Sequence, residues 1–411
     1  MKDSSYRPIR KILVDPEYSK LRIWLAVALL VLGVTLIAVF LGRNLSVEPG
    51  WITVKIDVQD SCSGDFYFQY YLGDSGQAPN IEKQTLADAY DRVARDAYQI
   101  FNEAESFEGV NNVQYLNAHP NETVEVPQVL YQAFALLEQY QNRALYLAPV
   151  YDHYVGMFLC DDDWAAKLYD PKQDADSAKF IADAITYAGD EQMVKLELLG
   201  GNQVKLNVAD AYLQFAKANE ITEFINFYWM KNAFIVDYMA SELEAAGFTG
   251  GIISSFDGFQ RNLGATKGSY SQNLFDRVGD TVYQTAIFTY EDVSALVSLR
   301  DFPGSQLAVQ QYFTWDNGEI TSCHIDIADG MSKTAAGELL GYSKTNSCAQ
   351  ILLELYPIYV ADTLDAEALA ALPAKGIDTI YAENFVIYTS DAAAKLSQLY
   401  TLDGVSYKRN G

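Results

Sequence analysis

The longest apolar segment of the chain lies near its N-terminus. Residues 23–42, IWLAVALLVLGVTLIAVFLG, contain no charged side chain. At about 1.5 Å of rise per residue, a helix of this length spans about 30 Å, the thickness of the hydrocarbon core of a bilayer. The pattern therefore predicts a transmembrane anchor at 23–42, a linker at 43–50 and one large domain at 51–411.

The charges around this segment predict its orientation. Six basic residues precede it, whereas Arg43 alone follows it before Lys55. Basic residues favour the cytoplasmic side, so we expect a cytoplasmic tail at 1–22, a single-pass anchor in the cell membrane and an extracytoplasmic domain. A cleaved signal peptide is the alternative, but the apolar run is long and no A-x-A site follows it. The six basic residues are Lys2, Arg7, Arg10, Lys11, Lys20 and Arg22.

Beyond residue 50, alternating patterns typical of strands and 3.6-residue patterns typical of helices are mixed. The predicted strands lie at 53–58, 66–72, 250–256, 281–290, 295–299 and, last, 384–390, with hairpins at 194–208 and 307–327. The predicted helices are 85–105 with Thr85 as cap, one from Pro127, 180–188, a broken pair over 210–246, and one from Ser347 that Pro357 ends. Residues 160–178 read as an acidic loop, with a calcium site at Asp161–Asp163 as the less favoured alternative. Because βαβ alternation is absent, the expected class is α+β.

The charge of the predicted domain restricts its partners. The chain has 29 basic and 54 acidic residues, and the first 50 residues hold seven of the basic and four of the acidic ones. The remaining 22 basic and 50 acidic residues give residues 51–411 a net charge of −28. Such a surface repels phosphate backbones, so we expect no nucleic-acid partner.

Few side chains suited to metal or nucleophilic chemistry occur in the sequence. Its three histidines, His119, His153 and His324, are too few for a His-rich metal centre, and no P-loop, G-x-S-x-G, C-x-x-C or H-E-x-x-H motif occurs. The four cysteines are widely spaced, so buried free thiols and one or two disulfides are both open. They are Cys62, Cys160, Cys323 and Cys348.

Three stretches, in order and spacing, resemble one family. They are QYLNAHPNETVEVPQVLYQAFALLEQY from Gln114, KNAFIVDYMASELEAAGFTGGIIS from Lys231, and SCHIDIADG from Ser322. Residues 52–408 resemble the bacterial FAD:protein FMN transferases, exported enzymes that pass FMN from FAD to a threonine of an acceptor protein with the help of Mg²⁺. The resemblance implies a flavin-transferase-like α+β domain, FAD as a possible cofactor, and envelope redox or acceptor proteins as partners.

The resemblance also implies site residues. His324, in His-Ile-Asp, matches the family's His-Ile-Ile-Asp and is the candidate base for the threonine proton. The candidate flavin-binding residues are Asn117 in the Leu-Asn match, Lys231 at the family's Ala-Lys-Gly, Gly258 near its Gly-Gly turn, and Asp326.

Several departures from the family fall on its metal site. The family's metal-binding Asp and Thr correspond to Cys348 and Leu352, and leucine offers no oxygen to Mg²⁺. Its Gly-Ala-Phe-Asp appears as residues 143–146, Arg-Ala-Leu-Tyr, and its Asp-Leu-Gly-Gly-Ile as residues 226–230, Asn-Phe-Tyr-Trp-Met, where bulky rings fill space that glycine leaves open. We therefore assign no metal ligand and regard Mg²⁺ as doubtful. The family's arrangement would bring Cys323 and Cys348 together, where a disulfide is possible.

Three hypotheses follow. The favoured one is a membrane-anchored flavin-transferase-like protein that has lost catalysis and acts in flavin binding or scaffolding at the cell envelope. The second is an active Mg²⁺-dependent FMN transferase, and the third is an interaction or sensory ectodomain that keeps only the fold.

Overall fold

A nine-stranded sheet forms the centre of the molecule. The computed structural model describes residues 16–45, 47–55, 59–73, 75–264, 268–402 and 404–410. Neighbouring strands in the sheet are antiparallel except for the last pair, β15 and β19, which is parallel. In spatial order the strands are β1 (Gly50–Val54), β2 (Phe66–Leu72), β6 (Gly251–Ser255), β7 (Phe259–Leu263), β10 (Ala295–Arg300), β13 (Glu338–Ser343), β14 (Asp378–Glu383), β15 (Val386–Thr389) and β19 (Lys408–Arg409).

Three helices cover one face of this sheet: α2 (Pro79–Ile100), α9 (Lys231–Ala245) and α10 (Cys348–Tyr359). Inward-facing rings of β2 pack on α2, and the ring centroids of Phe68 and Tyr90 lie 5.1 Å apart. Helix α10 lies so close to β13 that a Cβ on Gly341 would be 2.7 Å from Leu355. The main hydrophobic core lies between this helical layer and the sheet.

A smaller sheet covers the opposite face near the C-terminal strands. Its order is β16 (Lys395–Ser397), β9 (Thr281–Tyr290) and β8 (Tyr270–Val278). The rings of Phe288 on β9 and Tyr342 on β13 lie 4.7 Å apart, within a second hydrophobic core. Strand β13 is therefore covered on both faces, by α10 and by the smaller sheet.

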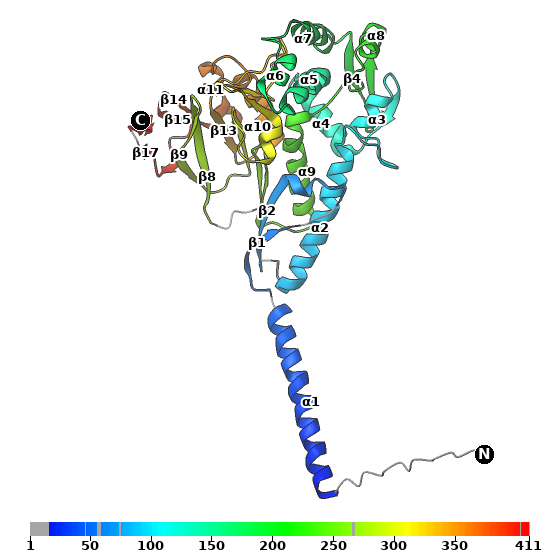
Figure 1. Cartoon of the computed structure of the whole chain (residues 1–411), viewed down its shortest axis with the longest axis vertical. Coiled ribbons are helices and arrows are strands. Elements are labelled where there is room, and N and C mark those ends of the chain that lie inside the picture. Colours follow the sequence, from blue (N-terminus) through cyan, green and yellow to red (C-terminus); the bar gives the residue numbers. More distant parts are fainter. Residues whose placement is uncertain are drawn as a thin grey trace, which may run out of the picture.

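The remaining elements form the end of the domain farthest from helix α1 (Pro16–Leu45) (Figure 1). A three-stranded sheet, in the order β3-β5-β4, lies among the small helices there. These elements are α3 (Val113–Ala118), β3 (Thr123–Glu125), α4 (Gln128–Gln139), α5 (Ala148–Phe158), α6 (Asp163–Ala166), α7 (Ala175–Ala188), β4 (Val194–Gly200), β5 (Gln203–Val208) and α8 (Asp210–Ala218). The other short elements are β11 (Tyr312–Thr314), β12 (Ile320–Ser322), α11 (Ala366–Ala371), β17 (Thr401–Leu402) and β18 (Val405–Ser406).

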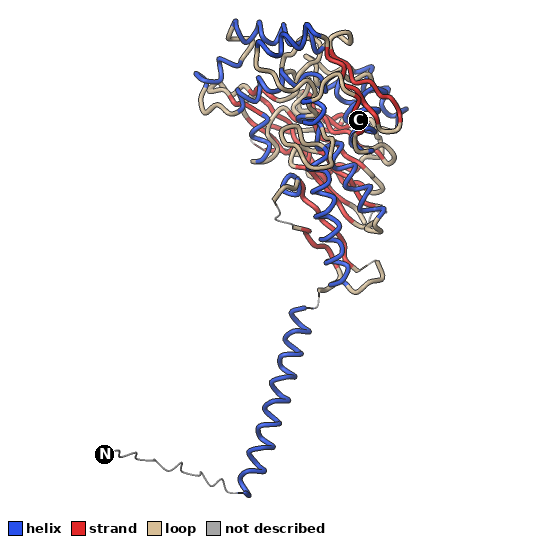
Figure 2. Tube along the Cα trace, turned by 90° about the vertical axis from the view of Figure 1, so that its right-hand side faces the viewer, coloured by secondary structure: helices blue, strands red, loops and turns tan. Residues whose placement is uncertain are grey.

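Helix α1 stands apart from the domain (Figure 2). Within it, Lys20–Ile37 has a mean hydropathy of 2.1, and none of this stretch is buried against the rest of the chain. By its length and composition, this helix is long enough and apolar enough to cross a membrane. Residues 1–15, which include four of the six basic residues of the predicted tail, lie outside the described residues, as do residues 56–58 of the first predicted strand.

The α+β class with one large domain is confirmed, and several predicted elements match the structure. Strands β2 and β9 have the predicted bounds, the 194–208 hairpin forms as β4 and β5, and the helical region 210–246 divides into α8 and α9. The signals for these elements are local, because alternation, Gly-Gly-Asn turns and helix caps act within a few residues.

Other predictions were wrong at element ends. Helix α2 starts at Pro79, so Thr85 lies inside it and is no cap; proline fits the first helical turn, where its missing N–H costs nothing. Pro357 does not end α10, which runs to Tyr359. The acidic loop contains α6, capped by Asp162, and short strands follow the one predicted as the last.

Candidate functional site

Three segments that include the candidate base and the departures from the family meet at one place in the fold. Trp229 lies in a short 3-10 turn, Tyr228–Met230, that leads into α9, and its indole stacks on Tyr356 of α10 with centroids 5.7 Å apart. The same indole meets the imidazole of His324 edge-on, at 4.7 Å. The turn before α9, helix α10 and the segment after β12 therefore converge on Trp229.

His324 is enclosed at this junction. It follows β12 and does not lie on a strand as predicted, since the hairpin is shorter than its alternating pattern suggested. The residue is 4% exposed, and Tyr359 and Tyr312 surround the ring with Trp229. Its Nδ1 lies 3.1 Å from the Ser322 hydroxyl. Burial lowers the pKa of His324 to about 3, so the ring is neutral at neutral pH.

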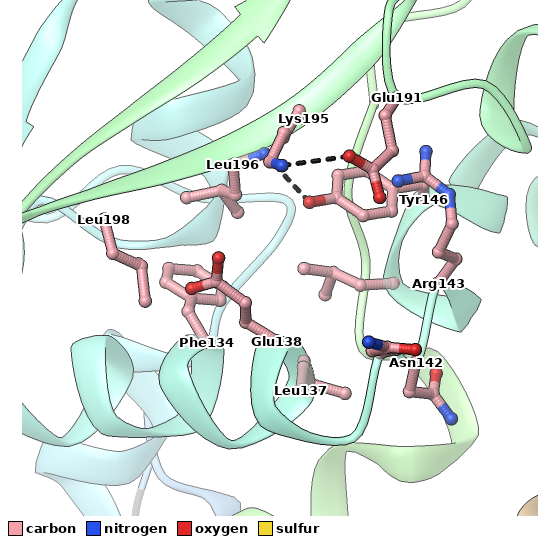
Figure 3. A pocket seen from close by; sticks show the side chains of 12 residues that line it. Phe134, Leu137, Glu138, Asn142, Arg143, Tyr146, Glu191, Lys195, Leu196 and Leu198 are labelled. Atoms are coloured by element: carbon pink, nitrogen blue, oxygen red, sulfur yellow. Dashed lines mark hydrogen bonds and ion pairs between the residues drawn. The ribbon is translucent and has the colours of Figure 1, made fainter.

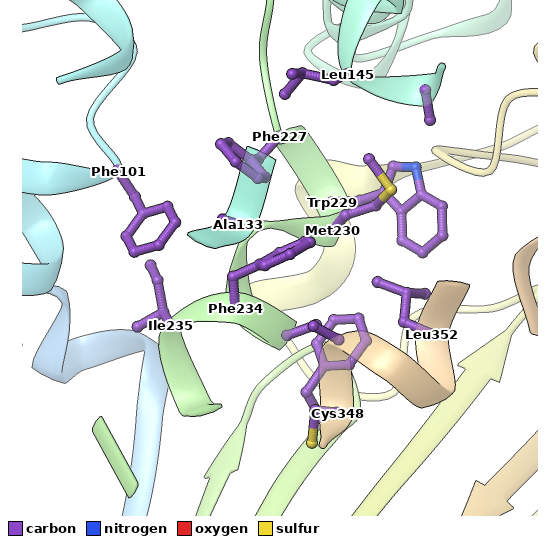
Figure 4. Packing of buried hydrophobic residues seen from close by; sticks show 14 of the residues in the cluster. Phe101, Ala133, Leu145, Phe227, Trp229, Met230, Phe234, Ile235, Cys348 and Leu352 are labelled. Carbon is purple, nitrogen blue, oxygen red and sulfur yellow. The ribbon is translucent and has the colours of Figure 1, made fainter. Parts of the chain in front are cut away.

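The positions that match the metal-binding Asp and Thr lie inside apolar packing. Cys348 and Leu352, on the first turns of α10, are fully buried in the main hydrophobic core, which also contains Trp229, Met230 and Phe234 (Figure 4). The Cys348 thiol donates to the carbonyl of Gln260 at 3.0 Å, and burial holds its pKa well above the usual range. A neutral thiol and a leucine do not fit Mg²⁺, which needs oxygen ligands.

The wider surroundings offer no other metal centre within the part of the chain that the structure describes. No three His, Cys, Asp or Glu side chains lie close enough together there to hold an ion. Asp237, which matches the Asp of the family's Val-Asp, uses its carboxylate for contacts within the protein. Its carboxylate accepts the backbone N–H groups of Cys348 and Ala349 at 2.9 and 2.8 Å and pairs with Arg261 at 2.8 Å. Asp237 therefore binds the first two N–H groups of α10 and adds to the cap that Ser347 provides.

The proposed disulfide between Cys323 and Cys348 is not formed. All four cysteines are free thiols, and Cys323 and Cys348 are both buried. Cys348 points to the backbone of β7 through its bond to Gln260, whereas the Cys323 sulfur lies 4.0 Å from the side chain of Gln311. The two thiols thus have different neighbours on different segments.

Asn117 forms a link between two segments. It is 5% exposed on α3, its side-chain N–H donates to the carbonyl of Ile225 at 2.9 Å, and its oxygen accepts from the N–H groups of Phe224 and Ile225. These three bonds fasten the segment that precedes Trp229 to α3. The polar atoms of the Asn117 side chain are therefore hydrogen-bonded to the protein's own backbone.

Lys231 lies at the first residue of α9 and forms an ion pair with Glu103, whose two oxygens are each 3.1 Å from its ammonium. Burial lowers the pKa of Lys231, but the carboxylates of Glu103 and Asp65 raise it by a larger amount, so the net shift of the pKa is upward. The pair borders a cavity of about 190 Å³ that Cys62 and Phe101 also line. Lys231 is therefore charged and paired.

Gly258 lies in the turn between β6 and β7 with φ of +105°, a conformation that favours glycine. A Cβ at this position would be 2.3 Å from the carbonyl oxygen of Ser298 on β10. The carbonyl of Gly258 accepts the Ser298 N–H at 2.9 Å. The glycine is required by the close approach of this turn to β10.

Asp326 shares Lys333 with Asp329, since both carboxylates lie 2.7 Å from its ammonium. The backbone N–H of Lys333 also donates to the carbonyl of His324, so this lysine ties the loop after β12 together. Among the described residues, no hydrogen bond joins any two of the five predicted site residues. The five residues lie on four segments of the chain, with His324 and Asp326 on one loop. The segments of Lys231 and Gly258 are joined next to these residues, where the Asn232 amide donates to the Asp257 carboxylate at 3.0 Å.

A cavity that the sequence did not predict lies beside α4 (Figure 3). It has a volume of about 500 Å³ and lies against β4. Its cations are engaged: the Arg143 guanidinium stacks over Tyr146 at 4.4 Å and donates to the carbonyls of Ala188 and Val194, and Lys195 pairs with Glu191 at 2.9 Å. The sequence showed residues 143–146 only as a departure from the family's Gly-Ala-Phe-Asp.

The overall arrangement of the chain is similar to known flavin transferases. Flavin transferase ApbE from Vibrio cholerae matches with a TM-score of 0.55 at 12% identity, over 87% of this chain and 99% of that chain. The ApbE protein from Thermotoga maritima matches with a TM-score of 0.53 at 14% identity, over 85% and 97%. The chain has an ApbE-like fold. The sequence matches no family model and no curated protein, and at these identities the likeness establishes the ApbE fold alone.

Proposed function

We propose that this protein is a membrane-anchored, extracytoplasmic member of the ApbE fold that has lost FMN transfer and serves as a scaffold at the cell envelope. The observation that carries the proposal is the complete burial of Cys348 and Leu352 in the main hydrophobic core, to which Trp229, Met230 and Phe234 also belong. The residues where a metal-dependent flavin transferase of this fold would need oxygen ligands are part of the hydrophobic core instead.

The surroundings of His324 support loss of catalysis. A general base must come within hydrogen-bond reach of the proton that it removes. His324 is enclosed by aromatic rings, with Trp229 against its edge and Ser322 on its Nδ1. A threonine of an acceptor protein would have to displace these rings to reach the imidazole.

The candidate flavin-binding residues support a scaffold rather than a flavin site. Asn117, Lys231 and Asp326 each use their polar atoms on partners within the protein. Releasing a paired charge in a partly buried place costs free energy that the ligand would have to offset. Envelope redox or acceptor proteins are the partners that this proposal expects.

The proposed membrane anchor and its orientation are inferred from helix α1 and the charges around it. The Lys20–Ile37 stretch is long and apolar enough to span a bilayer, and the basic residues lie on its N-terminal side. We therefore place the N-terminus in the cytoplasm and the large domain outside.

A titration of the full-length protein with FAD, followed by flavin fluorescence with and without Mg²⁺, tests the proposal. We expect no saturable binding at micromolar FAD, and no effect of Mg²⁺. If FAD binds and Mg²⁺ does not change its affinity, the protein binds flavin, and the scaffold proposal is replaced by a flavin-binding role. Binding that Mg²⁺ strengthens, with AMP released, would instead support an active FMN transferase.

A further inference from the structure

The end of the domain next to α1 carries partly exposed aromatic side chains on the first strands of the sheet. In the antiparallel β1–β2 pair, Trp51 lies opposite Tyr71, and their rings meet at 5.6 Å. Tyr270, at the start of β8, packs edge-on against Trp51 at 5.9 Å. Trp51 nonetheless remains 43% exposed. We call Trp51, Tyr71 and Tyr270 the proximal aromatic edge.

The first turn of α2 adds an apolar side chain at the same end. Ile81 is 54% exposed. The adjoining Glu82 accepts the backbone N–H of Gly73, the residue after β2, at 2.8 Å, which fixes the start of α2 beside the end of β2 that pairs with Trp51. The exposed indole and Ile81 thus lie at one end of the domain, the end nearest α1 (Figure 1).

The chain connection keeps this end close to the membrane helix. Only residues 46–49 separate α1 from β1, and Pro49 packs on Gly73, where a Cβ would lie 2.7 Å from the proline ring. Four residues extend over at most about 15 Å. Trp51 is therefore held within about 20 Å of the end of α1, whichever way the domain turns.

We propose that the proximal aromatic edge and Ile81 rest in the headgroup region of the membrane that α1 spans. Tryptophan and tyrosine favour this region because a ring and a polar N–H or O–H suit its mixed character. A zwitterionic bilayer is the surface we assign, since residues 51–411 carry a net charge of −28 and are repelled by anionic lipid. The inference rests on the anchoring in the proposed function and adds the side of the domain that faces the lipid.

The test is fluorescence quenching of the full-length protein in phosphatidylcholine vesicles with nitroxide-labelled headgroups. A Cys160→Ser background removes the half-buried thiol, and a fluorophore is attached at Ile81→Cys or, as matched control, at Trp164→Cys. Trp164 is 78% exposed and lies on α6, in the part of the domain away from α1. The unsubstituted background reports labelling of the three buried thiols.

We expect the label at position 81 to lose most of its fluorescence to the headgroup nitroxide and the label at position 164 to keep it. Trp51→Ala should reduce quenching at position 81. Equal, weak quenching at both positions would overturn the inference. A label at Leu29→Cys, quenched by acyl-chain nitroxide, separates this failure from a failure of anchoring: if position 29 is not quenched, the anchor itself is refuted, and the inference with it.

Discussion

The indole of Trp229 lies edge-on against the imidazole of His324, with ring centroids 4.7 Å apart. Trp229 stands where the family resemblance places small residues, and His324 where it places the candidate base. The bulky Trp229, at a position where the family has a small residue, therefore packs directly on His324, the residue that the transfer reaction would need as a base.

Removing the indole should cost stability and release the histidine. Trp229 is 2% exposed, and truncation of a buried tryptophan to alanine costs about 3–5 kcal/mol. We expect Trp229→Ala to lower the free energy of unfolding by this amount and to raise the pKa of His324 toward its ordinary value. Urea unfolding and the NMR titration of His324 check the two effects. Trp164→Ala is the control, and a loss as small as that of this exposed tryptophan would contradict the packing described here.

His324 should also make the protein less stable in mild acid. Its pKa is about 3 in the folded protein and about 6.5 in the unfolded chain. As pH falls below 6.5, only the unfolded chain takes up the proton, so stability is lost between pH 6.5 and 3. Between pH 7 and 5 the loss from this group is about 2 kcal/mol. Urea unfolding of the wild type and His324→Gln at both pH values isolates it, and equal losses in the two proteins would show that the ring titrates normally.

Restoring the family's two metal ligands should not restore a metal site. In Cys348→Asp combined with Leu352→Thr, a buried carboxylate would replace a thiol that donates to the carbonyl of Gln260, and a hydroxyl would enter apolar packing, which together costs several kcal/mol. We expect a lower free energy of unfolding that Mg²⁺ does not recover. Leu352→Met, which conserves volume, should cost less than about 1.5 kcal/mol. Stabilisation of the double variant by Mg²⁺ in thermal unfolding would show that the site can still form.

Asp237 should matter for stability through α10. The side chains of Asp237 and Arg261 are 16% exposed, so breaking this partly buried pair costs less than the cost of about 3–5 kcal/mol for a fully buried one, and the loss of the bonds to the start of α10 adds to it. We expect Asp237→Ala to destabilise the protein strongly, and Asp237→Asn less, because its amide oxygen still caps α10. Asp96→Ala, which breaks an exposed pair with Arg92, is the control. Equal unfolding midpoints for all three variants would contradict the role of Asp237 as a cap.

Comparing Gly258 with Gly76 separates the effect of close packing from the effect of a positive φ angle. Gly76 also has a positive φ, +77°, but nothing lies within 4 Å of a Cβ built there. Alanine at Gly76 should therefore cost about 1 kcal/mol from the backbone conformation. Alanine at Gly258 should cost clearly more, because its Cβ would be 2.3 Å from the Ser298 oxygen. Similar changes in unfolding free energy for Gly76→Ala and Gly258→Ala would remove this argument.

Local signals made much of the fold predictable. The β2 strand was evident from its alternation, the β4–β5 hairpin from its turn residues, and α4 from the stripe of Leu130, Ala133, Phe134 and Leu137, all of which are buried. Errors arose where long-range packing decides the outcome. Pro357 stays inside α10, and the hairpin before His324 ends at Ser322.

The site was less predictable than the fold. The departures at Cys348 and Leu352 could be read from the sequence, but only the structure shows that Asn117 binds the backbone at Phe224 and Ile225, more than 100 residues away. Sequence alone left open whether Cys323 and Cys348 form a disulfide, since the direction of each thiol depends on distant neighbours.

The most direct test of the central claim is AMP release from FAD. The full-length protein is incubated with FAD and Mg²⁺, with flavin transferase ApbE from Vibrio cholerae as positive control, and AMP is measured by chromatography. The account predicts release no faster than in buffer alone. AMP release that requires Mg²⁺ and is lost in His324→Gln would contradict it and establish an active site behind Trp229.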